Sequence, residues 1–372
     1  MKILHLSTWP EGGAAKAAIR LSTQLNLSGT ESRVLHMSTK IPSYIDAVIG
    51  KLTKSTNPIF HSYNYFGENI SHDISKFKPD IIHIHWIGAG YIRPESLVKL
   101  GQPIVWTLHD LWPLCGAEHF PSSLKRFTEG YLSTNRGKLD KGLDLDRFVW
   151  QRKQDILPKL NLNFIAPSKY MFNIAKRAKS LNSHKLVYIP NGLNPNIYNL
   201  KRSTSGKKAM ILFVAMNPDF DINKGYTDFI QAVELLPKNL QKTTIVKVVR
   251  GDVKNEKKLA SIYSQANITV VSSKIENLPF VIMESLASGT PVVSYNVGGI
   301  SDLVSHKVNG YLARPNDIKD LSEGIQFILK NLDIQRQYGI NGRRRISKDF
   351  NISNIAKEHL KLYKEISNIV KL

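Results

Sequence analysis

The fold is decided by the stretch from Glu276 to Gly299, which reads ENLPFVIMESLASGTPVVSYNVGG. The apolar run just before it, residues 268–271, predicts a buried parallel strand. Residues 281–287 then predict a helix, because Pro279 suits the first turn of a helix and Gly289 suits the position just past its end.

A second apolar strand, residues 291–295, follows this helix and leads into a turn at Gly298 and Gly299. The order strand, loop, helix and strand predicts one βαβ unit of a doubly wound α/β sheet. Sheets of this kind bind their ligands at the carboxyl ends of the strands. We therefore expect the loop and the helix start of this unit to face a ligand.

Two acids lie in this stretch: Glu276 in the loop and Glu284 in the predicted helix. The free N–H groups and the positive dipole of a helix start suit a diphosphate or a sugar hydroxyl. A carboxylate in the loop can accept hydrogen bonds from a sugar, and one further along can accept both hydroxyls of a ribose. Taken singly, Glu284 also fits a helix surface residue and Glu276 fits a helix cap.

The string ENLPFVIMESLASGTPVV resembles the E-x7-E signature of retaining, nucleotide-sugar-dependent glycosyltransferases of family 4, and the continuation GGISDLVSHKVNGYLARPND resembles the same family. The resemblance covers nearly the whole chain. It implies the α/β GT-B fold, with two Rossmann-like domains and a cleft between them. It also implies the subgroup that builds bacterial polysaccharides and cell-surface glycans.

This resemblance implies a domain division into residues 1–190, which bind the acceptor, and residues 191–352, which bind the nucleotide-sugar. The string VYIPNGLNPNIYN, residues 187–199, is typical of the crossing between such domains, and a linker rich in lysine and serine follows at residues 201–208. Residues 353–372 predict a helix that crosses back to the first domain.

The chain of 372 residues has a formal net charge of +21, which favours nucleic acid, an anionic membrane surface or anionic substrates as partners. No zinc knuckle or other nucleic-acid-binding motif occurs. Cys115 is the only cysteine, so an internal disulfide is impossible and a reducing compartment is expected. No signal peptide and no run of about 20 apolar residues is present. These features favour a cytoplasmic enzyme, peripheral on the anionic face of the cytoplasmic membrane.

The first domain opens with a strand, residues 2–7, a loop containing Gly12 and Gly13, and a helix over residues 14–27. A glycine pair of this kind also occurs in plain strand-to-helix connections. In the family that the chain resembles, this loop faces the donor phosphates, which makes Gly13 a donor-binding candidate. Lys16, one turn into the helix, is a candidate on the acceptor side.

The next strand, residues 80–86, carries His83 and His85 on one face, a pattern that also fits a metal pair. No third ligand occurs at a recognisable spacing, so no metal is expected. We interpret His85 and Trp86 as the carboxyl end of the strand, on the acceptor side of the site.

His109 follows a buried strand, residues 103–108, and matches the family's histidine beside the transferred sugar. The resemblance implies a catalytic role, in which a neutral ring accepts a hydrogen bond from a sugar hydroxyl or stabilises charge. Further acceptor-side candidates are Asp110, Glu118 and His119. Residues 116–146 have few apolar anchors and predict a mobile loop that contacts the acceptor or the membrane.

In the second domain, Lys224 precedes a predicted helix and suits a diphosphate as a point charge. Members of the family also carry a basic residue a few positions earlier, and this chain has none there. Arg250, after the strand over residues 245–249, is the candidate replacement. The DFD string at residues 219–221 resembles the metal-binding motif of the other glycosyltransferase fold but lacks its context. Residues 251–259 match the place of the nucleotide base.

The resulting hypothesis is a metal-independent and cofactor-independent hexosyltransferase that uses a UDP- or GDP-linked sugar. Glu276 holds the sugar with a catalytic role, Glu284 holds the ribose, and Lys224 meets the diphosphate together with the loop and helix start formed by Asn277, Leu278, Pro279 and Phe280. No carboxylate nucleophile is evident, so the resemblance implies a front-face transfer with retention. Two rivals remain: a GT-B-type sugar-nucleotide epimerase and a basic nucleic-acid-binding protein.

Overall fold

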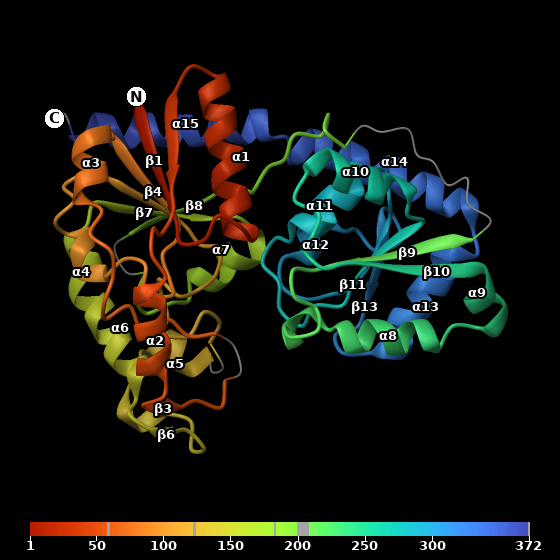
Figure 1. Cartoon of the computed structure of the whole chain (residues 1–372), viewed down its shortest axis with the longest axis horizontal. Coiled ribbons are helices and arrows are strands. Elements are labelled where there is room, and N and C mark those ends of the chain that lie inside the picture. The colour runs from red at the N-terminus through yellow and green to blue at the C-terminus, as the bar shows by residue number, and fades with distance from the viewer. Residues whose placement is uncertain (58–59, 122–123, 182–183, 199–207, 371–372) are drawn as a thin grey trace. The chain divides into compact units, whose positions relative to one another are not determined.

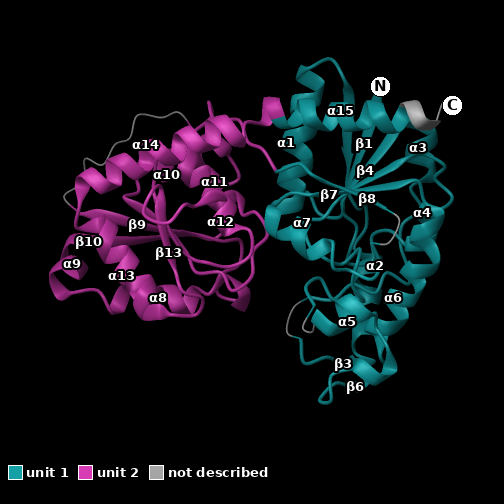
Figure 2. Ribbon diagram, turned by 180° about the vertical axis from the view of Figure 1, so that it is seen from behind, with its two compact units in different colours: residues 1–190, 355–372 teal, residues 191–354 magenta. Residues whose placement is uncertain are grey.

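The computed structural model describes residues 1–57, 60–121, 124–181, 184–198 and 208–370, with side chains described up to residue 367. Within the predicted linker, residues 201–207 lie outside the described residues. The chain divides into two compact units (Figure 2). Unit 1 comprises Met1–Pro190 and Ile355–Leu372, and unit 2 comprises Asn191–Asn354.

Unit 1 is built on a six-stranded sheet in the order β2-β1-β4-β5-β7-β8. All neighbours in it pair in parallel. Its strands are short, largely apolar runs, as expected for a parallel sheet with both faces covered. They are β1 (Lys2–Ser7), β2 (Glu31–Leu35), β4 (Ile81–Trp86), β5 (Ile104–Thr107), β7 (Leu162–Ala166) and β8 (Lys185–Tyr188).

Helices cover both faces of this sheet (Figure 1). The helices of unit 1 are α1 (Gly13–Leu27), α2 (Ile41–Gly50), α3 (Ser71–Phe77), α4 (Pro94–Leu97), α5 (Leu124–Glu129), α6 (Leu145–Ile156), α7 (Lys169–Ala175) and α15 (Ile352–Val370), with 3-10 turns η1 (Ser133–Asn135) and η2 (Leu157–Lys159). The Ser168 side chain accepts a hydrogen bond from the Met171 amide at 2.9 Å, which confirms the predicted cap of α7.

One face of the unit 1 sheet is covered by α1 and the C-terminal helix α15. Leu21 of α1 and Tyr363 of α15 share an apolar cluster with Ile3, Ile81 and Val105 of the strands. The opposite face carries the larger cluster around Ile82, Ile84 and Trp106. The alternation of side chains along each strand produces this division.

The prediction of a mobile, poorly anchored loop over residues 116–146 is wrong in its premise. Phe127 and Tyr131 are fully buried in the main core of unit 1, at 0% and 1% exposure. The segment also contains α5, η1 and β6 (Lys141–Gly142), which pairs antiparallel with β3 (Thr53–Lys54). Two aromatic residues anchor it because each buries far more apolar surface than the small polar residues around it.

Unit 2 is built on a five-stranded parallel sheet in the order β10-β9-β11-β12-β13. Its strands are β9 (Ala209–Val214), β10 (Thr244–Val249), β11 (Ile268–Val271), β12 (Val292–Tyr295) and β13 (Gly310–Ala313). Its helices are η3 (Ile222–Lys224), α8 (Tyr226–Glu234), α9 (Lys238–Thr243), α10 (Glu256–Gln265), α11 (Phe280–Ala287), α12 (Ile300–Leu303), α13 (Ile318–Leu329) and α14 (Leu332–Asp349). The predicted βαβ unit is confirmed: α11 connects the neighbouring parallel strands β11 and β12.

Candidate functional site

The carboxyl end of the unit 2 sheet brings Lys224 and Glu276 together, although 52 positions separate them in sequence. Lys224 follows β9 and Glu276 follows the neighbouring strand β11. Their side chains form an ion pair, with Nζ donating to Oε1 at 2.8 Å, and remain 31% and 14% exposed. The charge of Glu276 raises the pKa of Lys224. An anionic ligand at this edge would meet a fixed ammonium beside a carboxylate.

Two glycines fix the loops that carry this pair. Gly225 and Gly298 have φ angles of 63° and 55°, in the left-handed region that favours glycine. A Cβ on Gly298 would lie 2.9 Å from the Glu276 carbonyl carbon and closer still to its oxygen, and a Cβ on Gly225 would overlap Ser272 in the same way. Only glycine therefore fits between these loops and sets the position of Glu276.

The helix start after Glu276 is formed as predicted, but its side chains are buried. Asn277, Leu278 and Phe280 are 8%, 5% and 6% exposed, and Pro279 occupies the cap position before α11. What this segment can offer a ligand is therefore its backbone N–H groups. Glu284, further along α11, is fully buried and accepts a hydrogen bond from the Tyr263 hydroxyl at 3.2 Å.

Arg250, the candidate replacement for the missing basic residue, forms an ion pair with Asp219, Nε to Oδ2 at 2.9 Å, and both are about half exposed. A hydrogen bond from Arg250 lowers the pKa of Asp219. The first acid of the DFD string is thus used to hold a guanidinium. The role of Arg250 toward the donor remains a prediction.

A second lysine, which was not predicted from the sequence, lies at this edge of the unit 2 sheet. Lys274 pairs with the carboxylate of Asp228, which also accepts a hydrogen bond from the Tyr295 hydroxyl at 2.8 Å. The Lys274 amide donates to the carbonyl of Asn223, beside Lys224. Its position in the loop between β11 and Glu276 was the available signal.

In unit 1 the loop after β1 leads into α1, as predicted. Gly12 has a φ of 94° and occupies the cap position of α1, and Gly13 is the exposed first residue of the helix. Lys16 lies in the first turn and is half-buried. The helix start carries no side-chain cap, which leaves its N–H groups suited to an anion.

At the carboxyl end of β5, His109 is joined to His85. Nδ1 of His85 lies 3.0 Å from Nε2 of His109, and the other ring nitrogen of His85 lies 3.0 Å from Nδ1 of His5. His85 is only 3% exposed, so it supports His109 from the core of unit 1. Burial lowers the pKa of His109 to about 4, which leaves the ring neutral at pH 7.

His5 supplies beside His83 and His85 the third imidazole that the sequence spacing did not reveal. His5, on the neighbouring strand β1, pairs with His83 in the sheet register. His5, His83 and His85 are all buried, and one ring nitrogen from each lies within 4.8 Å of the others. Sequence spacing could not find His5, because strand order and not sequence order makes it a neighbour.

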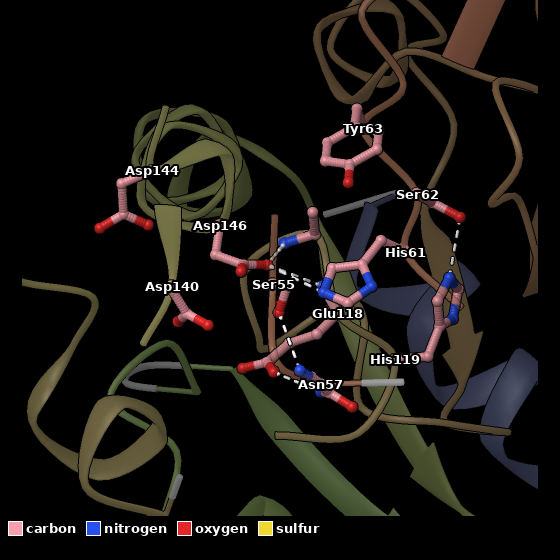
Figure 3. Close-up of polar contacts among 12 residues, drawn as sticks. Ser55, Asn57, His61, Ser62, Tyr63, Glu118, His119, Asp140, Asp144 and Asp146 are labelled. Carbon is pink, nitrogen blue, oxygen red and sulfur yellow. Dashed lines mark hydrogen bonds and ion pairs between the residues drawn. The ribbon is translucent and has the colours of Figure 1, made fainter. Parts of the chain in front are cut away.

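Asp110 and His119 form a second polar group, which includes Trp86 and Ser62. Asp110 Oδ2 lies 2.6 Å from Nδ1 of His119 and accepts from the Trp86 ring N–H at 2.7 Å. His119 Nε2 lies 2.8 Å from the Ser62 hydroxyl, as Figure 3 shows. The Ser62 hydroxyl oxygen also accepts from the Ala89 amide, and Ser62 is fully buried. This Ser-His-Asp order therefore locks loops together and presents no accessible nucleophile.

Glu118 is held in the same region of unit 1, away from solvent. It is 3% exposed and accepts a hydrogen bond from Asn57 at 2.8 Å (Figure 3). It also accepts one from the Tyr131 hydroxyl at 2.6 Å. These bonds tie the segment after Cys115 to the loop around Asn57.

Models of known protein families match both halves of the chain. The family model described as glycosyltransferase family 4 matches residues 11–197, about half of the chain, and the model of glycosyl transferases group 1 matches residues 251–345. The chain belongs to glycosyltransferase family 4.

Solved structures place this family 4 chain in the GT-B fold. Sucrose-phosphate synthase from Thermosynechococcus elongatus is 19% identical, with a TM-score of 0.69 and 98% of each chain covered. HepE of Anabaena, solved in complex with UDP-glucose, is 15% identical, with a TM-score of 0.64, and the match covers 98% of this chain and 100% of HepE.

Curated relatives match this family 4 chain over shorter stretches. The chain spans about a third of the length of the first two such relatives, 30% and 34%. It is 30% identical over 191 residues to a Campylobacter jejuni enzyme named as an α-1,4-N-acetyl-D-galactosaminyltransferase acting on an undecaprenol-diphosphate-linked glycan. That match covers 45% of this chain and 51% of the enzyme.

Unit 1 of this family 4 chain also contains a pocket of about 350 Å³ beside the polar group of Asp110 and His119. Its lining includes the aromatic residues Trp9, Phe60 and Tyr63, together with Asp46 and His61. The Phe60 ring lies 5.6 Å from the His119 ring and 6.3 Å from the Trp86 ring. Aromatic faces next to a carboxylate and an imidazole are a lining that suits a sugar.

Proposed function

We propose that the protein transfers a sugar, with retention of anomeric configuration, from a UDP- or GDP-linked donor to a glycan or lipid-linked acceptor in bacterial surface polysaccharide synthesis. Membership of family 4 supports the reaction class. The Campylobacter relative supports a lipid-linked glycan acceptor, and the UDP-glucose complex of HepE supports a uridine nucleotide.

The observation that carries this proposal is the pairing of Lys224 with Glu276 at the start of α11. In the transfer, the anomeric carbon–oxygen bond breaks and a bond to the acceptor hydroxyl oxygen forms on the same face. The nucleoside diphosphate leaves with the electron pair, and its departing oxygen takes the proton of that hydroxyl. Its growing negative charge needs donors already in position. Lys224 and the backbone N–H groups near Phe280 meet that need, and Lys274 adds a second cation at the same edge.

Glu276 then binds the hydroxyls of the donor sugar, and Glu284 binds the ribose. Glu284 already accepts a hydrogen bond from Tyr263, so its carboxylate is oriented before the nucleotide arrives. The two carboxylates on this short segment of unit 2 are thus assigned to two parts of the donor, its ribose and its sugar. His109 of unit 1 acts on the sugar during transfer.

For the acceptor, we assign the aromatic pocket of unit 1. Trp9 and Phe60 provide faces on which a sugar ring can stack, and Asp46 and His61 provide polar contacts. Of the candidates from sequence, Trp86 and His119 contact this pocket through Phe60, whereas Glu118 has a structural role through Asn57.

Peripheral binding to an anionic membrane forms part of the same proposal. In the described part of the chain no helix has both the length and the apolar character that crossing a bilayer requires. One face of α2 exposes Ile41, Tyr44 and Val48, at 63%, 68% and 60%, spaced three and four positions apart. Such a stripe, on a protein of net charge +21, suits the interface of an anionic bilayer.

Vesicle co-sedimentation tests this part of the proposal. The double variant Tyr44→Ser/Val48→Ser should lose most of its binding to phosphatidylglycerol vesicles. The matched double variant Leu332→Ser/Ile340→Ser, which removes two apolar side chains of α14 that are 62% and 55% exposed, should retain it. Equal loss in both variants would contradict the assignment of α2.

The reaction itself is tested with a panel of UDP- and GDP-sugars, first by thermal shift and then by transfer assays with lipid-linked acceptors. Glu284→Ala should mainly weaken donor binding, whereas His109→Ala should mainly slow transfer. Equal effects of the two substitutions would count against these roles. Formation of an epimer without acceptor would favour an epimerase, and salt-sensitive binding of nucleic acid in preference to nucleotide-sugars would overturn the proposal.

A further inference from the structure

The sheet face beneath α15 carries an unusual group of histidines. His5 of β1 and His83 and His85 of β4 lie on this face, with His109 at the end of β5 and His359 on α15. The ring centroids of His83 and His85 are 4.2 Å apart, and those of His85 and His109 are 5.3 Å apart and stacked. All of them except the half-buried His109 are buried.

Three of these rings form a continuous hydrogen-bonded chain. Nδ1 of His5 lies 3.0 Å from Nε2 of His85, and Nδ1 of His85 lies 3.0 Å from Nε2 of His109. Burial lowers the pKa of His5 to about 3 and of His109 to about 4, and lowers that of His85 well below its usual value. Each ring is therefore neutral at pH 7, with one donor and one acceptor nitrogen.

Because each ring has one N–H, the chain has only two possible proton arrangements. Its protons point either from His5 toward His109 or from His109 toward His5. The second arrangement places a hydrogen on Nε2 of His5. That atom is buried and has no hydrogen-bond partner among the described residues. The first arrangement leaves only a lone pair there, and among buried backbone groups an orphaned N–H is rarer than an under-satisfied acceptor.

We propose that His5 and His85 are positioning residues that hold His109 in its Nδ1–H tautomer. In this arrangement His5 donates to His85, and His85 donates to Nε2 of His109. Nε2 of His109 is then occupied as an acceptor and cannot take a proton from a substrate.

Resting on the proposed function, this inference fixes the direction of the hydrogen bond that His109 makes during transfer. Nδ1–H is the only donor that the neutral ring has, so a sugar that contacts this nitrogen must offer it an acceptor oxygen. His109 therefore acts as a hydrogen-bond donor, which differs from the role of acceptor that the sequence also allowed.

The other polar groups packed against these three histidines do not change the direction of their hydrogen bonds. His83 contacts the Tyr363 hydroxyl at 2.6 Å and the Thr107 hydroxyl at 2.7 Å, so both of its nitrogens are occupied. His359 donates from Nδ1 to the Ile355 carbonyl at 2.9 Å, because a carbonyl can only accept.

A metal ion at His5, His83 and His85 is the competing use of these nitrogens. An ion would need the lone pair of each ring that it binds, including nitrogens that now share protons at 3.0 Å. A bound ion and the proton chain therefore exclude each other, and the two lead to different spectra.

The test is nuclear magnetic resonance of the full-length, ligand-free protein with 15N-labelled histidine. Two-bond 1H–15N correlations report the tautomer of each ring, and His109→Gln assigns the His109 signal. We expect His109 as the Nδ1–H tautomer in the wild type and in His5→Asn, whose amide replaces the Nδ1–H donor. We expect a mixture of tautomers in His5→Leu, which lacks a donor.

An Nε2–H signal for His109 in the wild type would overturn the proposal, and that result requires no variant to fold. A His109 signal in His5→Leu that equals the wild-type His109 signal would also overturn it. So would shifts of the His5, His83 and His85 signals that saturate at one equivalent of zinc chloride. As a further check, His85→Asn supplies its own amide to His109, so adding His5→Leu to that variant should leave the His109 signal unchanged.

Activity gives an independent readout. In a transfer assay, His5→Leu should lower kcat by about two- to tenfold with little change in KM for the donor, and His5→Asn should restore it. Equal loss in His5→Leu and His5→Asn would overturn the positioning role. If the wild type turns over no nucleotide-sugar, the proposed function fails. The tautomer measurement still decides whether His5 and His85 hold His109 as the Nδ1–H tautomer.

Discussion

The contact between Gly298 and Glu276 gives a sharp test of how the donor site is built. Replacing Gly298 by alanine places a methyl group at a φ of 55° and within 2.9 Å of the Glu276 carbonyl carbon. Ordinary carbon–carbon contacts are about 3.5–4.0 Å, so this contact alone requires a movement of about 0.6 Å, and the carbonyl oxygen of Glu276, which lies closer still, requires more. The matched control is Gly289→Ala, which has a similar φ of 75° but meets no atom within 4 Å.

The two substitutions share one cost and differ in another. A left-handed backbone costs an L-residue roughly 1–2 kcal/mol, which applies to both Gly298→Ala and Gly289→Ala. Overlap with packed atoms adds about 1–3 kcal/mol, which applies to Gly298→Ala alone. One kcal/mol corresponds to about 2–4 °C in Tm for a domain of this size. We therefore expect a loss of about 2–8 °C for Gly289→Ala and about 4–20 °C for Gly298→Ala.

Nucleotide-sugar affinity separates the two variants more clearly. Displacing the Glu276 loop weakens a charge-assisted hydrogen bond, worth about 1.5–3 kcal/mol, and so lowers affinity by roughly 10- to 100-fold. Gly289→Ala should leave affinity within about twofold of the wild type, because Gly289 lies at the far end of α11. Calorimetry with the donor found in the panel measures both. If the two variants lose stability and affinity equally, the close approach does not position Glu276.

Three further predictions concern individual side chains. Glu276→Gln removes the charge that raises the pKa of Lys224, so it should weaken binding of the nucleotide-sugar about tenfold while leaving the free nucleotide at least as tightly bound, as calorimetry with both ligands will show. Burial lowers the pKa of Lys153 to about 7, so the unfolded state binds more protons above pH 7. Wild-type stability should therefore rise by about 2 kcal/mol between pH 7 and pH 9 relative to Lys153→Met, and parallel curves in denaturant titrations would refute this. Ser168→Ala should cost about 1 kcal/mol of stability through loss of the cap on α7, whereas Ser168→Asp should cost less and neither should change nucleotide affinity.

The parts of the fold that were predictable are those whose signal is local. The strand over residues 268–271, the helix after Pro279 and the glycine past its end are encoded within one window, and the structure reproduces them. The cap at Ser168 is local in the same way. Phe127 and Tyr131 were missed as anchors because two aromatic residues in a polar segment have no periodicity, and only their tertiary packing shows that they are core.

The pairings within the site depend on strand order, which no local window contains. Lys224 and Glu276 meet because β9 and β11 are neighbours in the sheet, with β10 on the outer side of β9. His5 meets His83 for the same reason, because β1 lies beside β4. The resemblance to the E-x7-E signature predicts that Glu276 and Glu284 bind the donor, but it does not predict which basic side chain each acid contacts.

The histidines under α15 have a physical significance that apolar core residues in the same positions would lack. The surrounding strands place Ile3, Ile81 and Val105 on this face, and apolar side chains at positions 5, 83 and 85 would continue the pattern with no polar group to satisfy. Burying imidazoles costs free energy that hydrogen bonds only partly return. Polar residues at several neighbouring core positions, where apolar residues are the rule, are expected at places where function requires them. Because His5 contacts His85 and His85 contacts His109, the function that best accounts for that cost is control of His109, the one member of this group that is not fully buried.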